Sequence, residues 1–353
     1  MTTKRTKTFQ FLGTSFRKYP VDPVFGIIWY SEYNGVGLPK QSPICEDWGT
    51  SSVLQFPLED GYDTPKILDT VYLSVVEKKF YSLECELPFK NIEGLQNEID
   101  ENGESKYDSI ILGLAPYGYI ALWIAGNRKE TLLGWYKGEE INISMEEYSP
   151  HDLTKSLDEC CNSFINADVI VKNNLIKNGL PPKCLFDSYM KQFCYRYIPI
   201  FQKWNQGKSE DWSTYKDEEI QLIFDYIEEY LFDGTFDKLH NDGLLKYHEA
   251  GKPKKLTIKW HVKKTEYAAY FWFEDEKIYS IFERFYGAHP DTKTDFIIRI
   301  DAEQRKYELA LFRQGLKEPQ IIPEDAYQLL VFKNKFEDYR SDNYNQERGA
   351  WIW

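Results

Sequence analysis

The chain has 353 residues, of which 42% are apolar and 28% charged, a balance that supports a packed core and argues against wholesale disorder. Acids outnumber bases by 56 to 43, giving a net charge of −13, so the chain should repel nucleic acids and anionic lipid surfaces. We therefore expect no nucleic-acid partner. No stretch stays apolar for the roughly 18 residues that a membrane span needs, so we expect no span.

The first 20 residues are the exception to this acidity. They contain no acid and five basic residues, Lys4, Arg5, Lys7, Arg17 and Lys18. We interpret residues 1–20 as a basic, flexible arm, in preference to an arm that binds nucleic acid. The start shows neither a secretory leader nor a lipobox cysteine, and the six cysteines include no CxxC pair. These features favour a cytoplasmic location.

Residues 21–148 are expected to form a β-rich, sandwich-like domain of mostly antiparallel strands. Alternating, β-branched and aromatic runs predict strands at 71–76, 80–87, 109–115, 119–125 and 129–135. Both faces of the run 119–125 are apolar, which is typical of a strand covered on both sides. Trp123 and Trp135 fall in these strands and are predicted to lie in the core.

Residues 149–353 are expected to form an α+β domain, with helices over about 153–233. Apolar residues recur there at helical intervals, and the clearest predicted helix runs from 214 to 233, with Gly234 as its left-handed cap. A second periodic run continues through Phe193 and Tyr197 to Trp204. We expect a helical segment over this run, with a kink or an end at Pro199.

A sheet with a helix is predicted over about 256–340. Strands are expected at 256–262, 267–273, 296–300 and 307–312, with a helix at 276–286. This order predicts an antiparallel ββαββ-type sheet with the helix packed on one face, and an α+β fold class for the chain. Gln328–Phe332 fits either a strand or a helix. The tail 343–353 is rich in aromatic residues and is expected to dock.

No motif in the sequence carries catalytic chemistry. The five histidines show no zinc-site spacing, and the stretch from Gly113 to Gly118 lacks the Lys-Ser/Thr that follows a phosphate-binding loop. Carboxylates are abundant, but a glycosidase pair cannot be placed from sequence. We therefore predict no catalytic residue, no metal and no cofactor. The absence of motifs does not exclude an enzyme, but it removes every positive reason to propose one.

Residues 71–81, 107–118 and 121–126 resemble an uncharacterised bacterial family, domain of unknown function 2931. The likeness extends through 332–337 and 343–346 to 349–353. The resemblance implies structural motifs and no catalytic residues. Many members look like lipoproteins, a role for which this sequence shows no leader. Other members occur beside effector genes of interbacterial secretion systems, so the resemblance implies an immunity protein.

The leading hypothesis is a non-enzymatic protein that binds another protein, such as a secreted toxin. Exposed aromatic residues would anchor the interface and acids would steer a basic partner. The expected contact residues flank a polar loop or lie on the acidic face of the 214–233 helix: Trp204, Trp212, Asp217, Glu218, Asp225, Glu228 and Glu229. Two alternatives remain open, a carbohydrate-binding module that uses exposed Trp and Tyr, and an enzyme with an unrecognised site. The oligomeric state is left open.

Overall fold

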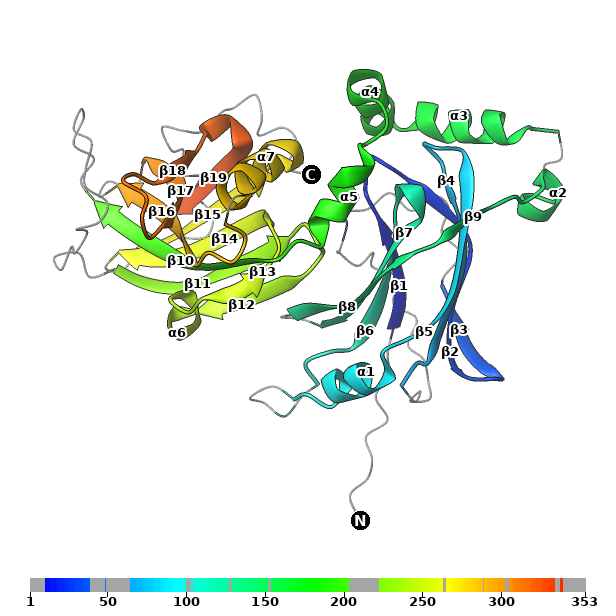
Figure 1. Ribbon diagram of the computed structural model, residues 1–353, viewed down its shortest axis with the longest axis horizontal. Helices are drawn as coiled ribbons and strands as arrows, with labels where there is room; N and C mark the ends of the chain where they lie inside the picture. Colours follow the sequence, from blue (N-terminus) through cyan, green and yellow to red (C-terminus); the bar gives the residue numbers. More distant parts are fainter. Residues whose placement is uncertain are drawn as a thin grey trace, which may run out of the picture. The chain divides into compact units, whose positions relative to one another are not determined.

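The computed structural model describes residues 10–38, 48, 64–99, 103, 105–126, 129–151, 154–202, 222–262, 265–287, 289–301, 305–333 and 337–338. The chain divides into two compact units, residues 1–187 (unit 1) and 188–353 (unit 2). Helices and antiparallel strands occur in both, so the predicted α+β class is confirmed (Figure 1). The first nine residues of the predicted arm and the aromatic tail 343–353 lie outside the described residues.

Unit 1 contains two sets of paired strands. The first has the order β1-β6-β7-β8, formed by Gln10–Ser15, Ser109–Leu114, Tyr119–Gly126 and Lys129–Lys137. The second has the order β3-β2-β4-β5-β9, formed by Asn34–Gly37, Val21–Ser31, Ile67–Ser74, Lys79–Glu86 and Glu139–Ile141. All neighbours are antiparallel except β1 and β6. Within the predicted arm, Gln10–Ser15 is therefore a paired strand.

The two strand sets of unit 1 share one apolar core. Leu68 and Tyr72 of β4 pack in the same cluster as Ile110 of β6 and Leu122 of β7, and all four side chains are fully buried. The Tyr72 hydroxyl donates a hydrogen bond to the Ala115 carbonyl at 2.7 Å, so the ring's polar end also has a partner. Burial of inward-facing residues from both sets gives the sandwich-like arrangement that the alternating runs predict.

The strand β7 is covered on both faces, as the sequence predicts, and so is its neighbour β6. On the side away from the shared core, Trp123 is fully buried and the Trp48 ring meets it edge-on, with centroids 5.0 Å apart. A Cβ at Gly113 would lie 2.4 Å from the Trp123 ring, so this position needs glycine. Trp135 of β8 is half-buried and its ring lies 5.7 Å from that of Trp48.

The helices of unit 1 are α1 (Phe89–Gln96), η1 (Pro116–Gly118), α2 (Met145–Tyr148), α3 (Leu157–Ala167), α4 (Val169–Asn178) and α5 (Lys183–Tyr189), whose end passes into unit 2. Ser156 and Glu159 form a capping box at the start of α3. Cys161 of α3 packs against Leu73 and Phe80 in a second small core. The helical prediction is thus confirmed for α3, α4 and α5, and α3 packs within unit 1.

Unit 2 contains two sheets and α7 (Asp275–Tyr286). The larger set has the order β12-β11-β14-β15-β19-β20, formed by Phe236–His240, Leu222–Leu231, Pro253–Val262, Thr265–Phe273, Tyr327–Lys333 and Glu337–Asp338. The smaller sheet has the order β13-β10-β16-β17-β18, formed by His248–Ala250, Phe193–Gln202, Thr294–Asp301, Tyr307–Arg313 and Gln320–Ile322. The described part of unit 2 also contains two short elements, α6 (Asn241–Leu244) and η3 (Glu324–Ala326).

The elements predicted after residue 256 are present, but their arrangement differs from the prediction. The hairpin β14–β15 belongs to the larger set, whereas β16–β17 belongs to the smaller sheet, so the two hairpins do not form one ββαββ sheet. The ambiguous run Gln328–Phe332 lies in strand β19. Residues 193–202 form strand β10, so the helical prediction there is wrong. Phe193, Tyr195 and Tyr197 are buried at alternate positions, which is the strand period.

The inner faces of the two sheets of unit 2 meet through aromatic rings. Trp260 of the larger set lies 6.3 Å from Tyr307 of the smaller sheet, and Phe273 lies 6.4 Å from Phe296. Phe282 of α7 is fully buried in the same unit. In the part of the chain that the structure describes, no helix has the length and apolarity needed to cross a bilayer.

Candidate functional site

The predicted contact residues divide between described and undescribed parts of the chain. Trp204, Trp212, Asp217 and Glu218 lie outside the described residues. Asp225, Glu228 and Glu229 lie on β11, which is a strand paired with β12 and β14, so the predicted helix is wrong over 222–231. Gly234 does have a positive φ, 83°, but it lies in the turn between β11 and β12 rather than at a helix end.

The strand places the three acids in different surroundings. The Asp225 carboxylate lies 2.8 Å from Nδ1 of His261, and the Glu228 carboxylate lies 3.0 Å from the Lys238 amine. Both acids are only partly exposed. Glu229 is buried, with 2% of its surface exposed. The three described acids therefore do not form one exposed acidic surface. Glu229 is buried, Glu228 is paired with a lysine, and Asp225 lies beside a histidine.

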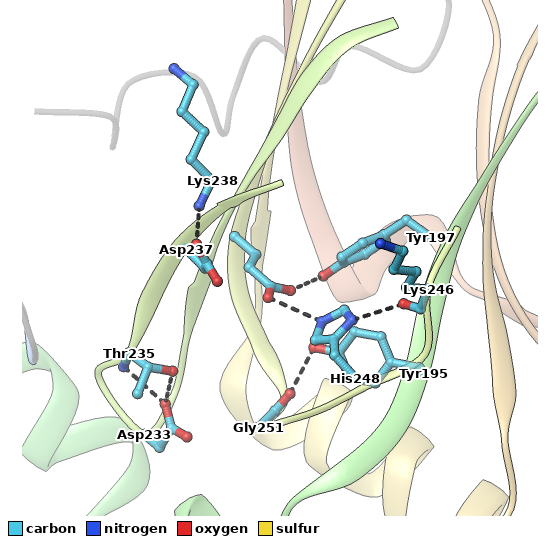
Figure 2. A network of polar contacts seen from close by, with 10 residues as sticks. Tyr195, Tyr197, Asp233, Thr235, Asp237, Lys238, Lys246, His248 and Gly251 are labelled. Atoms are coloured by element: carbon cyan, nitrogen blue, oxygen red, sulfur yellow. Dashed lines mark hydrogen bonds and ion pairs between the residues drawn. The ribbon is translucent and has the colours of Figure 1, made fainter. Parts of the chain in front are cut away.

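Glu229 is the centre of a buried polar network that joins β10, β11 and β13. The Tyr197 hydroxyl donates a hydrogen bond of 2.7 Å to one Glu229 oxygen, and Nε2 of His248 lies 3.1 Å from the other. The Tyr195 hydroxyl donates to the Gly251 carbonyl at 2.9 Å. Figure 2 shows Tyr195, Tyr197 and His248 turned toward one another. The carboxylate is therefore buried with partners for both of its oxygens.

Burial and charge act in opposite directions on this network. Burial disfavours the charged form of His248, but the hydrogen bond and the negative charge of Glu229 outweigh it and raise the pKa of the imidazole above 6.5. Burial, with the negative charge of Glu229, raises the pKa of both Tyr195 and Tyr197, so both hydroxyls stay protonated donors. The network therefore holds the Glu229 carboxylate beside an imidazole whose pKa is raised.

A second buried carboxylate shapes the turn that follows β11. Asp233 accepts hydrogen bonds from the Thr235 backbone amide at 2.9 Å and from the Thr235 hydroxyl at 2.7 Å. It also accepts one from the Gln192 side chain at 3.0 Å. Burial raises the pKa of Asp233 in spite of these bonds. The carboxylate fixes the hairpin turn, as Asp side chains commonly do when they bond to the backbone two residues on.

Lys252 is a third buried charged residue of unit 2. Only 1% of its surface is exposed, and its amine donates hydrogen bonds of 2.8 Å to both the carbonyl and the hydroxyl of Ser188. Burial lowers the pKa of this amine to about 8. These contacts are with the protein itself, so we assign Lys252 a structural role. Among the residues that the structure describes, no group of three or more His, Cys, Asp or Glu side chains is placed to hold a metal ion.

The outer face of β11 and its neighbours carries a different set of side chains. Residues directly opposite each other in a sheet point to the same face, so the pairing register defines three rows across β12, β11, β14 and β15. The rows are His240–Tyr226–Lys259–Ala268, Lys238–Glu228–Thr257–Tyr270 and Phe236–Tyr230–Lys255–Trp272. We call seven of these residues the lysine–aromatic face: Tyr226, Tyr230, Lys238, Lys255, Lys259, Tyr270 and Trp272. All seven are half-buried.

The amines of this face lie against aromatic rings. The Lys238 amine is 3.4 Å from the centroid of the Tyr226 ring, and the Lys259 amine is 5.3 Å from the same ring. The Lys255 amine lies between 4.9 and 5.8 Å from the rings of Tyr230, Tyr270 and Trp272. Each contact is within the distance at which a ring quadrupole attracts a cation. The sheet thus holds three ammonium groups in place on a rigid strand framework.

The sequence contained part of the signal for this face. Lys259, Tyr270 and Trp272 lie in two runs that are correctly predicted as strands, and Lys255 comes one residue before the first of these runs. The strand that the sequence analysis missed is β11, because the helical prediction over 222–231 placed Tyr226 and Tyr230 on a helix. Without β11 the lysines of β14 have no visible connection to the rings beside them.

In unit 1, the motifs 71–81 and 107–118 meet at one turn. Tyr117 has a positive φ of 61°, unusual for a non-glycine residue, and its backbone amide donates to the Glu77 carboxylate at 2.6 Å. The Tyr81 hydroxyl donates to the other Glu77 oxygen at 2.9 Å. The Tyr117 hydroxyl bonds to the Pro181 carbonyl at 2.8 Å. Glu77 therefore connects the two motifs and holds the turn at Tyr117 in its unusual backbone conformation.

One family model matches a region within unit 1. Residues 18–173 match the family described as Protein of unknown function (DUF2931). The predicted resemblance is confirmed over this region, and its extension to 332–353 stays a prediction. No curated protein and no solved structure matches the chain. The lysine–aromatic face and the Glu229 network lie in unit 2, beyond the DUF2931 region, so the family match carries no information about them.

Proposed function

We propose that the protein is a non-enzymatic binding protein that captures another protein, as an immunity protein captures a toxin. The observation that carries the proposal is the lysine–aromatic face, which combines four aromatic rings with three amines on one sheet. Aromatic side chains dominate the binding energy of many interfaces, because they bury a large area with few rotatable bonds. A paired sheet holds them in position before the partner arrives, which lowers the ordering entropy lost on binding.

The immunity role rests on the family resemblance of the DUF2931 region and on the lack of catalytic motifs. A protein that blocks a toxin needs a stable framework and a complementary surface, with no chemistry of its own. The buried contacts of Glu229, Asp233 and Lys252 supply such a framework in unit 2. We therefore assign the contact surface to the lysine–aromatic face instead of the acidic helix that the sequence predicted.

The test is co-expression with the product of a neighbouring toxin-like gene. We expect the two proteins to co-purify and the host to be rescued, and we expect Tyr270→Ala with Trp272→Ala to abolish both. Tyr33→Ala is the matched control, because Tyr33 is an aromatic residue of unit 1 that is 93% exposed. Circular dichroism and thermal melting confirm that each variant folds. A double variant that still rescues and co-purifies would refute the role of this face.

A carbohydrate-binding module is the second candidate, favoured by the rings of Tyr270 and Trp272. Their planes are nearly parallel, at 15°, with centroids 5.7 Å apart. Aromatic rings at a rigid surface are the side chains on which sugars stack. Glycan arrays and titration calorimetry distinguish this candidate, since a sugar ligand should bind the wild type and the Tyr33→Ala control but not the variant Trp272→Ala.

A further inference from the structure

We propose that one sheet face of unit 1 docks an amphipathic helix of another protein, with basic side chains along the border of its apolar stripe. The face belongs to the sheet β3-β2-β4-β5-β9 and is turned away from the shared core of the unit. It has an apolar half and an acidic half, so we call it the acidic–apolar face. Because it lies in unit 1, the proposal goes beyond the proposed function, which assigns a contact surface to unit 2.

The apolar half of the face lies on β2 and β4. Ile28 and Leu68 point into the shared core, so the residues on either side of them in each strand point the other way. The register places five apolar side chains there: Phe25, Ile27, Trp29, Ile67 and Val71. Phe25 is 39% exposed, and the Trp29 ring lies over Gly35 of β3, where a Cβ would come within 2.6 Å of it. The apolar half therefore extends across β2 to the strand at the edge of the sheet.

A helix of the chain itself shows how this side of the sheet is covered. The row of paired residues next to Val71 contains Leu73 and Phe80. Both are buried in one small core with Cys161 of α3, and Phe164 of α3 packs against it. This cover ends before Phe25, which is 39% exposed. A second helix laid beside α3 would bury the apolar half in the same arrangement of helix on sheet.

The acidic half of the face lies on β4, β5 and β9. The paired rows that contain Phe25, Ile27 and Trp29 carry no base and four carboxylates: Asp69, Glu84, Glu86 and Glu139. Within the described parts of the chain, none of the four carboxylates forms an ion pair. The lysines that flank β4 and β5 have other neighbours, since the Lys66 amine lies 5.9 Å from the Phe89 ring and Lys79 pairs with Glu140 at 2.7 Å.

Two of these carboxylates lie directly opposite each other. Asp69 of β4 pairs in register with Glu84 of β5, which places their Cβ atoms about 5 Å apart. Burial, together with the negative charge of Glu84, raises the pKa of Asp69. Like charges at opposed positions of a sheet repel and destabilise it. An ammonium or guanidinium group between the two would replace this repulsion by two attractive contacts, so the pair favours a basic ligand.

The two halves together select the occupant. A surface helix carries an apolar stripe about 100° wide, and Lys or Arg at its border can lie along apolar surface while the charged end reaches an acid. The net charge of −13 attracts such a helix from a distance. Residues 39–63, which follow β3 in the chain, contain five acids and one base, so their charge does not suit the acidic half. A basic helix of another protein fits both the apolar and the acidic half.

The experiment measures the fluorescence anisotropy of a labelled peptide that carries Leu and Lys at helical spacing. The same peptide with Glu in place of Lys, and oligolysine, are the comparison probes. We expect the Leu-Lys peptide to bind the full-length wild type. The variant E84Q/E86Q should bind it roughly tenfold more weakly, because two attractive charges are lost. Phe25→Ala should weaken binding several-fold, because apolar contact is lost.

The matched controls make the same changes elsewhere in unit 1. E93Q/E146Q removes two charges at exposed positions of α1 and α2, and Ile176→Ala truncates a side chain of α4 that is 75% exposed. Both controls should bind the Leu-Lys peptide as the wild type does. Thermal melting checks that every variant folds.

Selective loss of binding in E84Q/E86Q and Phe25→Ala would support the proposal. Equal binding of the Leu-Glu peptide or of oligolysine, an equal loss in the controls, or no binding of the Leu-Lys peptide to the wild type would overturn it. The variant Tyr270→Ala/Trp272→Ala should bind the peptide normally, and a loss there would place the peptide on the lysine–aromatic face instead. The proposed function has its own readout, because failure of the wild type to capture the toxin-like protein would remove that function and leave the peptide result unchanged.

Discussion

Glu228 and Glu229 are neighbours in β11, but the two faces of that strand place them in opposite environments. Glu229 points to the inner face, where Tyr197 and His248 bind its carboxylate. Only 2% of the surface of Glu229 is exposed. Glu228 points to the outer face, half-exposed beside Lys238. A carboxylate thus stabilises the fold on the inner face and contributes negative charge to the surface on the outer face. The comparison teaches that the location of an acid relative to the sheet, not its place in a charged run, decides its role.

The largest effect is expected from Glu229→Ala. The change leaves the buried Tyr197 hydroxyl and the partly exposed His248 imidazole without their acceptor, and the loss of both contacts costs about 3 kcal/mol of the free energy of unfolding. Urea denaturation followed by circular dichroism measures this loss. Glu229→Gln is the control, since its amide oxygen keeps one acceptor, and it should lose less. Equal losses for the two variants would show that the hydrogen bonds do not hold the inner face.

Tyr197→Phe should have an intermediate effect. It removes the donor to Glu229 but keeps the ring, which is fully buried and packs 5.4 Å from Phe296. Loss of one hydrogen bond to a charged group costs about 1.5 to 3 kcal/mol. The matched control is Tyr230→Phe on the outer face, which should change the urea midpoint by far less. A larger loss for Tyr230→Phe would reverse the assignment of the two faces.

The inner face also explains how far the sequence could predict this fold. The strands β6, β7, β14 and β15 and helix α7 follow directly from their patterns, because apolar residues alternate in the strands and recur every three or four residues in the helix. In β11 the inward positions are Ile227, Glu229 and Leu231, so a carboxylate interrupts the apolar strand pattern. The remaining apolar residues then fit a helix better than a strand.

Only residues distant in the sequence explain why a carboxylate occupies this inward position of β11. Glu229 is an acceptable inward residue because Tyr197 and His248, at separations of 32 and 19 residues, bring it donors. Local periodicity contains no trace of these partners. The same limit applies to the lysine–aromatic face, whose lysines and rings come from four different strands. The chemistry of individual strands could be predicted, but their register and the partners across the sheet could not.

A pH titration sharpens the comparison further. The folded-state pKa of His248 is raised above 6.5 by Glu229, so its stabilising contribution is complete below that value and is lost as the pH rises through the raised pKa. The pKa of Asp233 is raised as well, so its contribution is also lost as the pH rises through the raised pKa and that carboxyl ionises. We expect the unfolding free energy of the wild type to fall more steeply above pH 6.5 than that of His248→Asn. Denaturation at a series of pH values measures both slopes, and parallel slopes would contradict the pairing.

The smallest effect on stability is expected from Glu228→Gln, on the outer face. A partly exposed ion pair contributes about 1 kcal/mol or less, so the urea midpoint should barely move. Urea denaturation of the wild type and the variant, followed by circular dichroism, measures the shift. A loss as large as that of Tyr197→Phe would contradict the position of Glu228 in a partly exposed ion pair on the outer face.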